Sequence, residues 1–122
     1  MLNTKKTTQD LLQEDLLRER ACTLARAGER LTDALEKLRS IEKDLTESLV
    51  LWHREVENGG RNPQSLRGEI NGKIRAYNRQ RDHVKTRYYY LIVTREALGI
   101  IHHERLDEIY QIPPKKRCLP EH

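Results

Sequence analysis

The segment EVENGGRNPQS, residues 55–65, decides the fold of this 122-residue chain, because it concentrates turn-forming residues near the midpoint. Asn58-Gly59-Gly60 is typical of a helix end, since glycine adopts the left-handed conformation that follows a helix C-terminus. Asn62-Pro63 is typical of a helix start, where asparagine caps free amides and proline needs no hydrogen-bonded N–H. With only about five residues between them, the second helix folds back antiparallel to the first. The segment therefore predicts an all-α helical hairpin.

Leucine recurs every seven residues before the turn, and a shorter apolar line follows three residues behind it. Two such lines are the a and d positions of a coiled-coil seam. Residues 8–57 contain no proline and only one glycine, Gly28. We therefore expect a first helix over about 8–57, started by a capping pair of Thr7 and Asp10. Its expected seam residues are Leu17, Leu24, Leu31, Leu38, Leu45 and Trp52.

The same period continues after the turn and predicts a second helix over about 63–110. Gly99 is a position where this helix could end early. However, Leu106 and Ile109 continue the apolar stripe, so one helix to residue 110 is expected. Arg81 falls beside the seam, and Glu42 is the expected partner for its charge. The expected seam residues of this helix are Ile70, Tyr77, Val84, Leu91 and Leu98.

Composition points away from a globular core and from a membrane protein. Charged residues make up 34% and apolar residues 36%, which is typical of long helices. No apolar run approaches the roughly 18 residues of a membrane span, and the first ten residues lack the apolar region of a secretory signal. Cys22 and Cys118 fit reduced thiols. We expect one cytoplasmic hairpin domain over 1–110, without membrane association.

Two short segments are apolar around the whole helix, namely residues 88–93 (YYYLIV) and 49–52 (LVLW). A helix that is apolar on every side is normally buried on every side, yet a lone hairpin leaves both segments in water. We therefore expect a homo-oligomer, most simply a dimer of hairpins that forms a four-helix bundle. The alternative is that the C-terminal tail covers YYYLIV within the monomer. The residues expected at the self-association surface are Tyr89, Tyr90, Ile92, Val93, Leu49 and Val50.

The net charge of +4 is unevenly distributed, since the first half is slightly acidic and residues 59–99 are basic. One interpretation is that opposite charges pair across the hairpin and orient its helices. The other is nucleic-acid binding, because residues 73–90 interleave cations with tyrosines. The candidate contacts for this alternative are Arg75, Arg79, Lys85 and Arg87.

No catalytic, metal or cofactor site is expected. His102 and His103 are neighbours on the predicted helix and point about 100° apart, so they do not chelate one ion together. The glycines match no phosphate-binding pattern. Pro113-Pro114 breaks the helical pattern, so residues 111–122 should form an extended, mobile tail. The basic PPKKR in this tail is either a docking segment for an acidic partner or nucleic acid, or a solubilising end.

These patterns predict a non-enzymatic structural or protein–protein interaction module, an oligomerising hairpin that acts as a scaffold or adaptor. The alternative is a small nucleic-acid-binding hairpin dimer that uses the basic face of its second helix.

Overall fold

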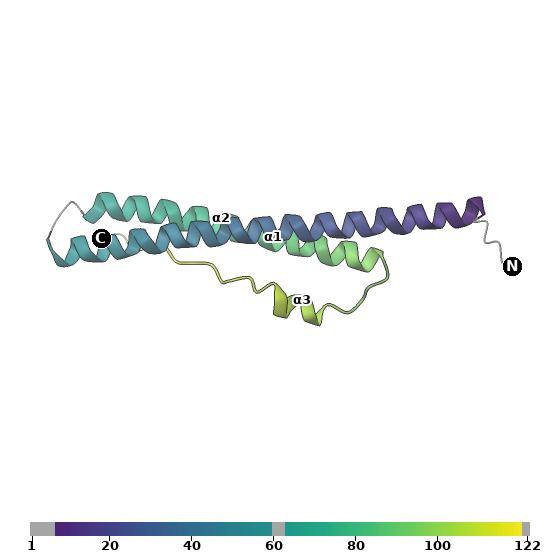
Figure 1. Ribbon diagram of the computed structural model, residues 1–122. Helices are drawn as coiled ribbons and strands as arrows, with labels where there is room; N and C mark the ends of the chain where they lie inside the picture. The colour runs from purple at the N-terminus through teal and green to yellow at the C-terminus, as the bar shows by residue number, and fades with distance from the viewer. Residues whose placement is uncertain (1–6, 60–62, 121–122) are drawn as a thin grey trace.

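The computed structural model describes residues 7–59 and 63–120, and these form an all-α hairpin (Figure 1). Helix α1 spans Thr8–Glu57, α2 spans Pro63–Ala97, and a short α3 spans Glu104–Ile109. α1 and α2 pack side by side. Residues 111–120, which we call the tail, run back toward the turn without regular secondary structure. The predicted hairpin is confirmed, and α1 has the predicted bounds.

Both ends of α1 follow from local sequence. Thr7 Oγ1 accepts from the Asp10 N–H at 3.1 Å, and Asp10 Oδ2 accepts from the Thr7 N–H at 3.2 Å. This reciprocal pair is the predicted capping box. At the other end the Asn58 N–H donates to the Arg54 carbonyl, and Gly59 has a φ of +62°, the left-handed conformation expected there. The predicted cap at Asn62 lies outside the described residues.

The second helix ends at Ala97, so the prediction of one helix to residue 110 is wrong. Gly99 has a φ of +86°. The Ile100 N–H donates to the Arg95 carbonyl and the Gly99 N–H to the Glu96 carbonyl, both at 2.9 Å. This pattern is a Schellman motif, which closes a helix through a left-handed glycine. Leu106 and Ile109, which continue the apolar stripe in the sequence, belong to α3, and Leu106 is buried.

The core is a single stripe of side chains between α1 and α2. Two polar contacts fix how the helices align: the Gln80 amide donates to the Ala34 carbonyl at 3.0 Å, and Lys73 lies 3.1 Å from Asp44. Leu24, Trp52 and Leu98 are half-buried. The seam residues that are buried are Leu31, Leu38, Leu45, Ile70, Tyr77, Val84 and Leu91.

α1 is 50 residues long and α2 only 35, so the N-terminal end of α1 extends past the end of α2 (Figure 1). We call residues 8–20 the arm, a length of roughly 20 Å at 1.5 Å per residue. Leu17 was expected in the seam, but its side chain is 63% exposed because α2 does not reach it. Leu11, Leu12 and Leu16 are exposed as well.

The tail is docked on the hairpin, so the expectation of a mobile tail does not match the structure. Its partners are on α2 and α1, and Ile112 and Leu119 pack against the core. Arg81 also differs from expectation: its Nε donates to the Pro113 carbonyl at 3.1 Å, whereas Glu42 pairs with Lys116 of the tail. The physical reason is that α2 ends early, which frees about 20 residues of chain to turn back and satisfy polar groups beside the seam.

Leucines of one heptad line should differ in their contribution to stability. Leu31→Ala removes a fully buried side chain and should lower the free energy of unfolding by about 2–5 kcal/mol. Leu17→Ala, on the exposed arm, should change it by less than about 0.5 kcal/mol. Urea unfolding followed by circular dichroism measures both. Equal losses would mean that the arm is buried in solution.

Candidate interaction surfaces

The C-terminal half of α2 carries an exposed apolar surface, which we call the aromatic patch. It consists of Tyr89, Tyr90 and Val93, whose exposed fractions are 62%, 53% and 41%. The two tyrosine rings lie 6.2 Å apart between centroids. Ile92 is half-buried and packs against the core instead. The patch therefore holds three of the four residues of YYYLIV that were expected to self-associate.

α3 covers YYYLIV only on one side. The Tyr88 hydroxyl donates to the Asp107 carboxylate, and Leu106 of α3 is buried against the core. Arg95 and Glu96 hold the connection to α3: Arg95 Nε donates to His103 Nδ1 at 3.3 Å, so the other ring nitrogen of His103 donates to Glu96 at 3.2 Å. Tyr88 is half-buried and Leu91 is buried, whereas the aromatic patch remains in solvent.

The second apolar segment, near the turn, is also divided. Leu49 and Trp52 are half-buried and pack against the core. Val50 and Leu51 are exposed. From the antiparallel arrangement, Val50 lies roughly 35 Å along the hairpin from Tyr90, at 1.5 Å per residue. The two exposed apolar sites therefore do not form one continuous surface on a single chain.

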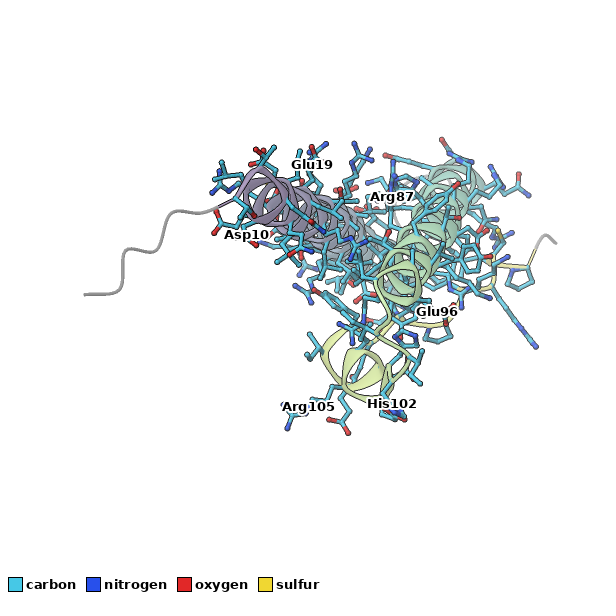
Figure 2. All side chains as sticks on the ribbon, turned by 90° about the vertical axis from the view of Figure 1, so that its right-hand side faces the viewer. Asp10, Glu19, Arg87, Glu96, His102 and Arg105 are labelled. Atoms are coloured by element: carbon cyan, nitrogen blue, oxygen red, sulfur yellow. The ribbon has the colours of Figure 1, made fainter. Side chains whose placement is uncertain are left out.

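A groove between α1 and α2 remains open on the side opposite α3. In Figure 2, which looks along the hairpin from the end opposite the turn, Arg87 lies on the upper side and α3 on the lower. This open groove has a volume of about 360 Å³. It is lined by Thr23, Arg26, Ala27, Arg30, Arg87, Tyr90 and Thr94.

Positive charge gathers along this open groove. A neighbouring hollow of about 220 Å³ shares Arg30 and Arg87 and adds Lys37 and His83, with Asp33 as its one carboxylate. Within residues 7–59 and 63–120, Arg26, Arg30, Lys37 and Arg87 form no ion pair. Arg30, Lys37 and Arg87 outnumber the carboxylate of Asp33 in this hollow, and like charges repel each other, so an anion bound between them is favoured.

Of the four candidate nucleic-acid contacts, only Arg87 lines the open groove. Lys85 is two residues away on the helix, which turns it about 200° from Arg87. Arg75 and Arg79 are exposed and do not line the groove. Arg26 and Arg30 were missed because they belong to the acidic half of the sequence. Their i, i+4 spacing and the antiparallel alignment with Arg87 are the signals that could have found them.

The opposite side of α2 binds the tail through two asparagines. Asn71 donates to the Leu119 carbonyl at 3.2 Å and accepts from the Leu119 N–H at 2.7 Å. Asn78 makes the same pair of bonds with Lys116, both at 2.9 Å. Each amide therefore satisfies the N–H and the carbonyl of one tail residue.

Two further side chains complete this surface, which we call the tail-binding face. Arg81 donates to the Pro113 carbonyl, and the Tyr77 hydroxyl donates to the Pro114 carbonyl at 3.3 Å. The Lys116 ammonium lies 4.9 Å from the centre of the Tyr77 ring and 3.5 Å from Glu42. Local sequence patterns do not predict this surface, because the partners are 32 to 48 residues apart.

Two tyrosines beside these surfaces have raised pKa values. Burial raises the pKa of Tyr88 to about 12, and the hydrogen bond to Asp107 adds to the effect. Burial, followed by the negative charge of Glu42, also raises the pKa of Tyr77. Both hydroxyls therefore remain hydrogen-bond donors throughout the neutral range.

Among residues 7–59 and 63–120, no three histidine, cysteine or acidic side chains come together as metal ligands would. Within the same described part of the chain, none of the helices combines the length and apolar character needed to cross a membrane. In comparisons with protein-family models, curated proteins and solved structures, no match was found for this chain.

The Tyr88–Asp107 contact should make stability fall at alkaline pH. An unfolded tyrosine ionises near pH 10, whereas Tyr88 in the folded chain ionises near 12. The unfolded state therefore loses its proton first, so the contribution of Tyr88 is complete below pH 10 and is lost as pH rises toward 12. Urea unfolding at pH 8, 10 and 11 should show the advantage of the native chain over Tyr88→Phe shrinking. A constant difference would contradict the raised pKa.

Proposed function

We propose that this chain is a non-enzymatic structural module that self-associates and acts through protein–protein contacts. The observation that supports this most is the aromatic patch. Tyr89, Tyr90 and Val93 remain exposed although α3 and the tail cover the neighbouring side of α2. Exposed tyrosines clustered with an aliphatic residue are typical of the centre of a protein interface.

A two-fold symmetric dimer would bring the exposed apolar residues of the two chains into contact with each other. If two hairpins pack antiparallel, the aromatic patch of each chain lies near the turn of its partner. Val50 and Leu51 are exposed near that turn. The aromatic patch of each chain would then contact Val50 and Leu51 of its partner, so the dimer would contain this apolar contact twice. A symmetric dimer repeats every contact in this way. The resulting assembly is the four-helix bundle that the sequence predicted.

A cytoplasmic location is part of this proposal. Cys22 and Cys118 are both free and exposed. Exposed free thiols persist in reducing compartments, whereas oxidising compartments convert them to disulfides.

The substitutions Tyr90→Glu and Val93→Glu together should dissociate the oligomer while leaving the hairpin helical. The reason is that two buried carboxylates at the centre of an interface would lack partners. Light scattering coupled to chromatography should show the mass falling to that of one chain, with circular dichroism largely unchanged.

A matched control is Leu11→Glu plus Leu12→Glu, which places the same charges at exposed leucines of the arm. This control should leave the mass unchanged. If the mass stays the same in the Tyr90 and Val93 variant, the aromatic patch is not the interface.

A second candidate function is the binding of a polyanion such as RNA or DNA. It is favoured by one specific observation, the unpaired Arg26, Arg30 and Arg87 around the open groove that Tyr90 also lines. Arginine contacts phosphates, and an exposed tyrosine offers a surface on which a base stacks. The face used would then be the open groove rather than the outer surface of α2.

Polyanion binding in the open groove should fall steeply with salt. Fluorescence anisotropy with a labelled single-stranded oligonucleotide at two salt concentrations measures it. Arg30→Ala plus Arg87→Ala should weaken binding at least tenfold. The double substitution should also reduce the slope of log affinity against log salt concentration, by the amount that corresponds to the loss of about two phosphate contacts. The matched control, Arg75→Ala plus Arg79→Ala, removes equal charge outside the groove and should have a much smaller effect. No binding of the native chain at low salt would eliminate this function.

A further inference from the structure

We propose that the tail-binding face is a peptide-binding site, in which the chain's own tail is the resident ligand. The site accepts an extended segment of another protein that carries the pattern of the tail: a proline, then two cations, then an apolar residue three positions later. It lies on a different side of α2 from the open groove. This proposal does not depend on self-association through the aromatic patch.

The spacing of the two asparagines matches an extended peptide. Asn71 and Asn78 are seven residues apart, which is two helical turns or roughly 10.5 Å. They bind Leu119 and Lys116, which are three residues apart. Three residues of a polyproline-type chain span roughly 9.3 Å. These two distances are similar, so amides seven residues apart on α2 can bind residues three apart in an extended ligand.

The exposure of the tail follows the same three-residue period. Pro113, Lys116 and Leu119 are half-buried. The residues between them are exposed to solvent. A ligand of this kind is recognised mainly through its main chain, because the amides of Asn71 and Asn78 and the donors of Tyr77 and Arg81 all contact backbone atoms.

A smaller set of contacts selects the side chains of the ligand. Lys116 lies between the Tyr77 ring and the Glu42 carboxylate. Lys115 lies 3.4 Å from Asp82. Leu119 packs against the edge of the core. The surface therefore favours two adjacent cations and one apolar residue after them, which is the class of segment that the PPKKRCL sequence of the tail represents.

Features of α2 point to a binding role beyond covering the core. Asparagine is a poor helix former, because its amide competes for backbone groups, yet two occur inside α2 at a seven-residue interval. Asn71 is almost fully buried beneath the tail. The two polar contacts that align α1 with α2, Gln80 with Ala34 and Lys73 with Asp44, do not involve the tail, so the tail can leave without separating the helices.

The tail can be followed through its exposed Cys118. In the full chain carrying Cys22→Ser, a spin label at Cys118 should give the spectrum of a restricted side chain. Adding an unlabelled peptide of residues 110–120, with serine in place of its cysteine, should convert the spectrum to a mobile one. Half conversion is expected at about 1–10 mM peptide, the effective concentration of a ligand held on a short tether.

A peptide N-methylated at Lys116 and Leu119 is the matched control, because it keeps every side chain but loses the two N–H groups that Asn71 and Asn78 accept. It should displace the tail at least tenfold less well. In the protein, Asn71→Ala plus Asn78→Ala should release the label without added peptide.

Three results would overturn the proposal. A label that is already mobile in the chain with intact asparagines would show that the tail does not occupy the site. No displacement by about 10 mM peptide would show that the site does not exchange its ligand. Equal displacement by the N-methylated peptide would show that main-chain recognition is not the basis of binding.

Discussion

Two helices that pack against each other bury only one face of each, and this constraint shapes the whole molecule. The seam between α1 and α2 is a single stripe of leucine, isoleucine, valine and tyrosine side chains. Everything to either side of that stripe is exposed unless some other part of the chain covers it. On one side the tail and α3 provide this cover, and on the other side the open groove remains (Figure 2). At the end of the hairpin, no helix within residues 7–59 and 63–120 lies beside the arm, because α2 is shorter than α1.

The features that could be predicted are those that depend on neighbouring residues. The Thr7–Asp10 cap, the left-handed Gly59 and the seven-residue period are each encoded within a few turns of chain. The end of α2 was ambiguous for the same reason. Gly99 carried a local stop signal, while Leu106 carried a periodic signal that turned out to belong to α3. The Schellman motif at Gly99 satisfies two helix carbonyls and ends α2. The apolar stripe does not require a longer helix, because α3 buries Leu106 equally well.

The features that could not be predicted depend on residues far apart in the sequence. Asn71 binds Leu119 across 48 positions, and the residues around Asn71 do not indicate that Leu119 is its partner. Arg26 and Arg30 meet Arg87 only because of the exact alignment of the helices. A shift of one turn would separate them. The expected pairing of Arg81 with Glu42 failed in the same way, because the tail supplied a partner for each of them.

The two proposed functions share one residue. Tyr90 belongs to the aromatic patch and also lines the open groove. A second chain packed on the aromatic patch would therefore restrict access to Arg26, Arg30 and Arg87. Under this account, self-association and anion binding compete at Tyr90, while the tail-binding face on the other side of α2 stays accessible in both states.

The central proposal, that a second copy covers the surface left by a two-helix seam, is tested most directly by the solution mass and shape of the unmodified chain. Light scattering combined with small-angle X-ray scattering should give twice the mass of one chain at micromolar concentration. The particle should be elongated, with a longest dimension of at least about 75 Å, the length of α1 at 1.5 Å per residue. The mass of a single chain at every concentration up to the millimolar range would contradict the account.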